Sequence, residues 1–151
     1  LADRLVEAGR LGQKSGSGYY RYDTATRARE EDPIVSGIIE ATRAELGITP
    51  REIPDEEIID RLTLALANEG ACILEEGIAQ RASDIDVVYC HGYGFPRFRG
   101  GPMHAAEARG LQSVVNRIEQ FQHTLNPDNW VLAPLLAKLA SEGGNFSDVK
   151  N

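Results

Sequence analysis

Apolar side chains recur every three or four residues along most of the chain, the spacing that gathers them on one face of an α-helix. The first residues already follow this pattern, with Leu1, Leu5, Val6 and Ala8, and Gly9 is a typical residue for ending a helix. The first residue is not Met. We therefore expect the sequence to be a fragment of a longer protein, beginning inside a helix.

Two signals mark the start of the next predicted helix. Asp32 is a favoured N-cap residue, and Pro33 suits the first helical position because the N–H that proline lacks has no partner there. The apolar stripe that follows, which Gly47 ends, consists of Ile34, Ile38 and Ala41.

A longer helix is expected after the turn around Pro50 and Pro54, with Asp55 as its N-cap. Its predicted inner stripe consists of Ile59, Leu62, Leu66, Gly70, Ile73 and Gly77. Glycine in a helix interior costs about 1 kcal/mol relative to alanine. The two glycines therefore predict that another backbone crosses this helix closely.

Four shorter helices and a glycine-rich loop are predicted for the rest of the chain. Ser83 and Asp86 have the spacing of a capping box ahead of a short apolar helix, and residues 91–101 form the loop. Pro102 starts the next helix and Pro134 the last. Two apolar stripes complete the pattern: Leu111, Val114, Val115, Ile118, Phe121 and Leu125, and then Leu135, Leu136 and Leu139.

The segment before Asp32 departs from the helical pattern. Residues 9–18 carry four glycines, which predicts an irregular connection that uses positive φ angles, and residues 19–22 suit a short strand or extended arm. Residues 23–31 are charged and poor in large apolar side chains, as in a solvated linker. The expected fold class is all-α with a short irregular or extended N-terminal arm. We place the domain boundary between residues 1–31 and a helical domain over residues 32–151.

Charge and composition exclude several classes of partner. The net charge of −7 and the pI near 5.0 disfavour nucleic acid and anionic membranes as general partners. No stretch approaches the roughly 20 apolar residues of a membrane span. Cys72 and Cys90 have neither a metal-site nor a redox spacing, so a reducing, cytoplasmic location is expected.

Few side chains are arranged for chemistry. His91, His104 and His123 lack the spacing of metal ligands, and surface or loop positions are expected for them. The cysteines lack a partnering base, so small buried positions are expected for both. We assign no catalytic, cofactor-binding or metal-binding residue to this chain.

The candidate substrate-binding residues are Lys14, Arg97 and Arg99. The glycines around Lys14 do not form a Walker loop, because Gln13 and not glycine precedes the lysine. Arg97 and Arg99 lie in a glycine-rich loop before a helix N-terminus, where guanidinium groups can bind a phosphate such as that of CoA. An ion pair or a solvated loop is the alternative interpretation.

Two separated runs resemble a known family, the multifunctional enzymes of fatty-acid β-oxidation. Residues 9–22, GRLGQKSGSGYYRY, resemble the end of their first C-terminal 3-hydroxyacyl-CoA dehydrogenase domain. Residues 67–103, ANEGACILEEGIAQRASDIDVVYCHGYGFPRFRGGPM, resemble the second such domain. The resemblance implies partners in the same polypeptide: an upstream Rossmann domain that binds NAD and carries the catalytic His and Glu, and often an enoyl-CoA hydratase domain. NAD is then the cofactor of the full-length enzyme, and none is expected in this chain.

The resemblance further implies a supporting role for the second helical domain, which is similar to a degenerate copy of the first. Where the first copy offers an Asn-Arg pair to the active site, this chain has Asp60 and Arg61. After Gly-Gly-Pro-Met, this chain has His104, Ala105 and Glu107 where relatives tend to have aromatic residues and an Asp.

The leading hypothesis is a supporting and packing domain of an NAD-dependent 3-hydroxyacyl-CoA dehydrogenase, without the catalytic Rossmann domain. The isolated chain would then be inactive, and its packing surface is expected to drive self-association. The alternative is a helical interaction module that contributes only to acyl-CoA binding or oligomerisation.

Overall fold

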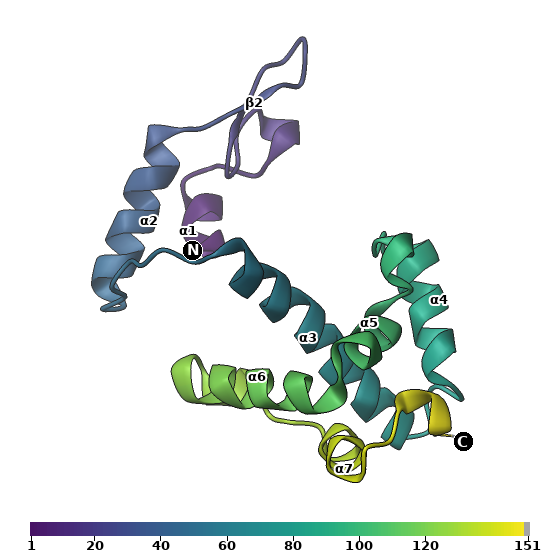
Figure 1. Ribbon diagram of the computed structural model, residues 1–151. Helices are drawn as coiled ribbons and strands as arrows, with labels where there is room; N and C mark the ends of the chain where they lie inside the picture. Colours follow the sequence, from purple (N-terminus) through teal and green to yellow (C-terminus); the bar gives the residue numbers. More distant parts are fainter. Residues whose placement is uncertain (150–151) are drawn as a thin grey trace. The chain divides into compact units, whose positions relative to one another are not determined.

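The computed structural model describes residues 1–149, and it confirms the all-α prediction (Figure 1). Within those residues the α-helices are α1 (Ala2–Glu7), α2 (Pro33–Glu45), α3 (Asp55–Glu75), α4 (Ala82–Gly92), α5 (Pro102–Arg109), α6 (Leu111–Thr124) and α7 (Pro134–Glu142). Strands β1 (Arg21–Tyr22) and β2 (Arg29–Glu30) form a small antiparallel sheet. Short 3₁₀ turns are η1 (Gln13–Ser15), η2 (Arg97–Arg99), η3 (Pro127–Asn129) and η4 (Phe146–Asp148).

The chain divides into two compact units, Leu1–Glu52 and the residues from Ile53 onward. The sequence places a boundary earlier, after residue 31. In the first unit, buried Arg10 explains the difference, because its Nε donates to the Gly18 carbonyl (2.9 Å) and its Nη2 to Asp32 (2.8 Å). Asp32 also caps α2 by accepting from the Ile34 N–H (3.0 Å). The opening segment therefore folds together with α2, and the division into residues 1–31 and 32–151 stays a prediction about domain ancestry.

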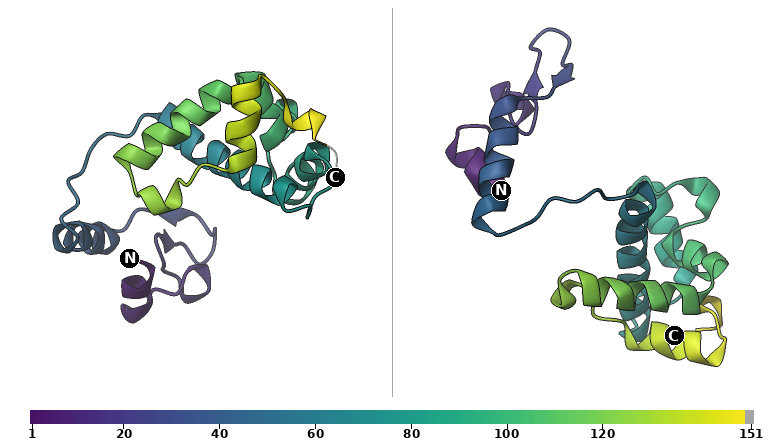
Figure 2. Two further views of the ribbon diagram at one scale, coloured as in Figure 1. Left: turned by 90° about the horizontal axis from the view of Figure 1, so that it is seen from below. Right: turned by 60° about the vertical axis from the view of Figure 1, so that its left-hand side comes forward.

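The charged stretch expected to be a linker is a β-hairpin that projects beyond the end of α2 (Figure 2). Arg21 pairs with Glu30 in register, and their side chains form an exposed ion pair of 2.8 Å. At the turn, the Asp23 carboxylate accepts from the N–H groups of Ala25 (3.0 Å) and Thr26 (2.6 Å), which lowers the Asp23 pKa. Exposed polar residues thus form an ordered hairpin through local hydrogen bonds. The pattern of apolar residues could not predict it, because these hydrogen bonds involve no apolar side chain.

The predicted glycine connection is confirmed in part. Gly9, Gly12 and Gly16 have positive φ, as expected. Gly18 has another reason to be glycine, because a Cβ there would come within 2.7 Å of the Gly12 Cα. In α2, the buried apolar residue is Val35, whereas Ile34 on the predicted stripe is 59% exposed.

The inner stripe predicted for α3 is confirmed only in part: Gly70 is buried and Ile73 packs against the core, but the stripe is wrong at its two ends. Ile59 and Leu62 are 46% and 65% exposed, and Gly77 lies beyond the helix with φ +71°. Asp55 is the first helical residue and not the cap, which is Pro54. The buried positions of α3 are Asp60, Leu64, Ala67, Gly70, Ala71 and Leu74. Periodicity failed here because the buried face carries an aspartate and three small residues.

The core of the second unit lies where α3, α5, α6 and α7 meet (Figure 1). The stripe predicted for α6 is confirmed by the burial of Leu111, Val114, Val115, Ile118 and Phe121. The predicted starts at Pro102 and Pro134 are confirmed too, since both prolines occupy the first position of their helices. η4 adds the buried Phe146, which the sequence pattern did not mark.

The predicted capping box of α4 does not form, because Asp86 caps a different helix. Its carboxylate is buried and accepts from the backbone N–H groups of Met103 (2.7 Å) and His104 (3.1 Å), at the start of α5. A Cβ on Gly101 would lie 2.3 Å from an Asp86 carboxylate oxygen, and the Gly101 φ is +113°. Glycine at 101 therefore permits the close approach on which this cap depends.

Gly70 confirms part of the expectation of close packing, although a side chain and not a backbone approaches it. A Cβ at Gly70 would lie 2.3 Å from the Met103 Sδ. Gly70→Ala is therefore expected to lower the free energy of unfolding by about 1 to 3 kcal/mol through overpacking, despite alanine's higher helix propensity. Gly37→Ala in α2 is the matched control, since nothing lies within 4 Å of its Cβ position, and it is expected to stabilise by up to about 1 kcal/mol. Urea unfolding measures both changes, and equal effects would contradict the packing account.

Candidate functional site

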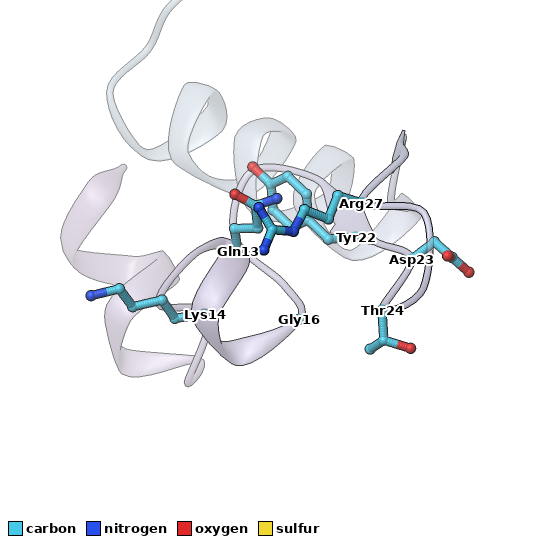
Figure 3. Close-up of a pocket in the computed structure, with 7 residues that line it drawn as sticks. All are labelled: Gln13, Lys14, Gly16, Tyr22, Asp23, Thr24 and Arg27. Atoms are coloured by element: carbon cyan, nitrogen blue, oxygen red, sulfur yellow. The ribbon is translucent and has the colours of Figure 1, made fainter.

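Lys14 lies at the edge of a recess of about 320 Å³ in the first unit (Figure 3). The walls come from η1 and the hairpin: Gln13, Lys14, Gly16, Tyr22, Asp23, Thr24 and Arg27. Figure 3 shows that the Lys14 side chain extends away from the Arg27 guanidinium. The two cations therefore do not point at one common position in this structure.

Arg27 is a residue of this recess that sequence reasoning missed. Its φ of +59° is in the left-handed region, which non-glycine residues seldom adopt. The Arg27 N–H donates to the Asp23 carbonyl (2.9 Å), so the hairpin turn holds the unusual backbone conformation. No sequence signal marks an arginine in this conformation, because the turn chemistry resides in Asp23 and Thr26.

Arg97 lines a second recess, of about 460 Å³, in the second unit. Helices α4 and α5 and turn η2 supply its walls: Ser83, Asp86, Val87, Cys90, His91, Arg97, Gly100 and His104. The recess combines one arginine and two histidines with the apolar surface of Val87. Such a mixture of apolar wall and few polar groups is typical of small-molecule sites.

Arg99 does not line this recess, although the sequence pairs it with Arg97. Its guanidinium instead lies over the ring of Phe98, 5.6 Å from the centroid, and Phe98 is 86% exposed. The 3₁₀ geometry of η2 separates the two arginines. Whether Lys14, Arg97 or Arg99 contacts a substrate stays a prediction.

The three histidines are exposed, as the sequence predicts, but they lie on helices and two of them share the second recess. His104 is held close to the loop: a Cβ on Gly100 would come within 2.4 Å of the His104 ring. The sequence did not reveal that they line one recess, because His91 lies in the last turn of α4 and His104 in the first turn of α5.

The strongest electrostatic cluster of the second unit surrounds Asp60. The side chain of Asp60 is 4% exposed and accepts from Arg109 of α5 and from the Nε of Arg117 of α6 (2.7 Å). The hydrogen bond from Arg109, aided by that from Arg117, lowers the Asp60 pKa against the opposing effect of burial. Arg61 pairs with Glu57 on α3. Asp60 thus ties three helices together, a role that the sequence did not reveal.

The cysteines are half-buried and unbonded to each other. Burial raises the pKa of the Cys72 thiol, with help from nearby glutamates, which disfavours a nucleophilic thiolate there. Within residues 1–149, no group of three or more His, Cys, Asp or Glu side chains is arranged to hold a metal ion. No helix in that range is both long and apolar enough to cross a bilayer.

No protein-family model matches the sequence. The peroxisomal bifunctional enzyme of Danio rerio is 48% identical over 147 residues, which cover 95% of this chain and 20% of that protein. The chain is a homologue of the C-terminal region of peroxisomal bifunctional enzymes. The fatty acid oxidation complex subunit alpha of Acinetobacter baumannii is 35% identical over 121 residues, or 80% of this chain and 17% of that protein.

The fold of this bifunctional-enzyme homologue also matches a solved structure, the dehydrogenase part of multifunctional enzyme 1 from C. elegans. The TM-score is 0.64 with 27% sequence identity, over 90% of this chain and 31% of that one. The family resemblance found in residues 9–22 and 67–103 is thereby confirmed. The chain spans about a fifth of the length of the curated relatives that it matches.

Proposed function

We propose that this homologue is a supporting and packing domain of an NAD-dependent 3-hydroxyacyl-CoA dehydrogenase that acts in fatty-acid β-oxidation. The observation that carries the proposal is the match of 90% of the chain to the dehydrogenase part of a multifunctional enzyme. The bacterial relative, a fatty acid oxidation complex subunit, supports the substrate class. The relatives are long polypeptides, which supports dehydrogenase and hydratase domains in the same chain as its partners.

The location of this protein is part of the proposal. The cytoplasmic location expected from composition stays a prediction, and the name of the Danio rerio relative favours the peroxisome as an alternative. Fluorescent tagging of the full-length protein in its own cells distinguishes the two.

Helix α3 offers the apolar surface that a packing domain needs. Ile58, Ile59 and Leu62 are 45%, 46% and 65% exposed on its N-terminal half, and we call these three residues the α3 patch. Apolar burial contributes about 25 cal/mol per Å², so covering the α3 patch favours association. We propose that other domains of the same polypeptide pack against the α3 patch and cover it.

The isolated chain is expected to bind no NAD and to reduce none with a 3-hydroxyacyl-CoA. The physical reason is that the proposal places the dinucleotide loop and the catalytic His and Glu in the Rossmann domain. Isothermal titration calorimetry with NAD measures this directly. A saturable heat with micromolar affinity would contradict the proposed division of labour.

The isolated chain is also expected to self-associate through the α3 patch when its normal partner is absent. Light scattering at micromolar concentration should give a mass above that of one chain, and a symmetric pair is the simplest assembly. The double change Ile59→Asp with Leu62→Asp should restore the monomer without loss of helix content, since both side chains are exposed. A monomeric parent chain would count against the patch as a packing surface.

A further inference from the structure

We propose that the recess between α4, η2 and α5 binds the phosphate group of an organic phosphate, with Arg97 as the cation and His104 and His91 as further donors. This site goes beyond the packing role and does not depend on it. Its organic ligand is expected to place an apolar part along Val87 and Cys90, which form the remaining wall.

The charge of the recess supports an anion. Arg97 of η2, His91 of α4 and His104 of α5 all line it. Arg97 supplies a positive charge, which attracts anions locally in a chain whose net charge is −7. Guanidinium N–H groups bind phosphate oxygens in a fork geometry, and imidazole N–H groups can donate to the same oxygens.

Asp86 is the acidic group among the lining residues, and its carboxylate is already engaged. Its two oxygens accept from the Met103 and His104 N–H groups, and its side chain is buried beneath the loop. Burial raises the Asp86 pKa, and the hydrogen bonds from the Met103 and His104 N–H groups oppose that rise. Glu107, one turn further along α5, is engaged as well, accepting from the Ser147 N–H (2.9 Å).

Two glycines in the loop between η2 and α5 allow side chains of the recess to pack closely against the backbone. Gly100 leaves space for the His104 ring, because a Cβ there would lie 2.4 Å from the ring, and Gly101 leaves space for Asp86. Both glycines have positive φ, at +78° and +113°, so replacement by other residues is strained as well as crowded. The loop therefore packs closely against His104, and η2 supplies Arg97 to the lining of the same recess.

The size of the recess indicates more than a bare ion. Its volume of about 460 Å³ is within the usual range of small-molecule sites, which begins near 300 Å³.

Three histidines in the sequence provide a test with an internal control. Pyrophosphate, inorganic phosphate and AMP are each titrated into the ¹⁵N-labelled full chain at pH 6.0 and constant ionic strength, and the imidazole signals are followed by NMR. The proposal predicts saturable shifts of His91 and His104 and no shift of His123 on α6. Tighter binding of AMP than of inorganic phosphate would show that the apolar wall contributes.

Two matched variants complete the test. Arg97→Gln is expected to weaken pyrophosphate binding about tenfold, the size of one charge-assisted hydrogen bond. Arg99→Gln removes the same charge two residues away and is expected to change the affinity less than about twofold, because its side chain lies over Phe98. Equal effects of the two variants, linear shifts of all three histidines, or no shift at all would each overturn the proposal. Circular dichroism of both variants verifies that the fold is retained.

Discussion

Replacement of Phe146 by alanine is expected to lower the free energy of unfolding of the second unit by about 3 to 5 kcal/mol, the usual cost of deleting a buried phenyl ring. Phe146 is fully buried in η4, and its ring belongs to the core formed with α3, α5, α6 and α7. The Asp148 carboxylate accepts from the Asn145 N–H (3.0 Å), and Glu107 accepts from the Ser147 N–H. The turn is thus fixed on both sides, so the cavity would close poorly.

Phe98→Ala is the matched control for this change. The Phe98 ring is 86% exposed, so its loss is expected to cost less than about 0.5 kcal/mol. Urea unfolding followed by circular dichroism measures both variants. If the two phenylalanines proved equally tolerant of alanine, η4 would not be part of the core.

Asp60→Ala is expected to lower the free energy of unfolding by about 2 to 3 kcal/mol. Removal of one partner of a buried ion pair commonly costs about 3 to 5 kcal/mol, and we reduce that value because Arg109 and Arg117 remain one-third and one-quarter exposed. Asp84→Ala is the control, since its pair with Arg81 is at the surface and is expected to contribute less than about 1 kcal/mol.

The Asp60 carboxylate should also make the free energy of unfolding depend on pH. Because the fold lowers the Asp60 pKa, the stabilisation is complete above the unfolded value of about 3.9 and is lost as the pH falls through the folded value. The parent chain should therefore lose more stability than Asp60→Ala does as the pH falls below about 3.9. Thermal unfolding across that range measures the difference, and parallel curves would exclude a role for the Asp60 charge.

If the second helical domain is a degenerate copy with a supporting role, Asp60→Asn is expected to leave turnover of the full-length enzyme nearly unchanged. Asp60→Asn keeps the shape but loses the charge that holds Arg109 and Arg117. The turnover expectation stays a prediction, and a fall in stability is now expected beside it.

Helix termini and the α6 stripe could be predicted because each depends on local chemistry. Pro102 and Pro134 fix φ at a first helical position, and the α6 residues from Leu111 to Phe121 repeat at an uninterrupted helical spacing. The capping role of Asp32 is equally local, since it binds the N–H of Ile34 two residues away.

The incorrect predictions have a different cause. At these positions, contacts with residues far away in the sequence decide which side chains are buried and which helix is capped. α3 buries Asp60 because Arg109 and Arg117 are supplied by helices about fifty residues away in the sequence. Asp86 has the spacing of a local cap for α4 but binds the start of α5. Phe146 stands alone in a polar, glycine-containing tail, so no periodicity signals its burial.

For the candidate sites too, some features could be predicted from the sequence and others depend on the tertiary structure. The basic loop before Pro102 could be recognised from composition, and the resemblance of residues 67–103 to a known family could be recognised from the order of the residues in that run. The separation of Arg97 from Arg99, and the approach of His91 and His104 to one recess, depend on the η2 turn and on the packing of α4 against α5.

Complementation in trans tests the packing role most directly. The Danio rerio peroxisomal bifunctional enzyme is truncated to remove the C-terminal region that this chain matches, and its reduction of NAD with a 3-hydroxyacyl-CoA is followed by absorbance. Our account predicts a low rate for the truncated enzyme, recovery on addition of micromolar chain, and no recovery with the Ile59→Asp, Leu62→Asp variant. A full rate without the chain, or equal recovery with the variant, would contradict it.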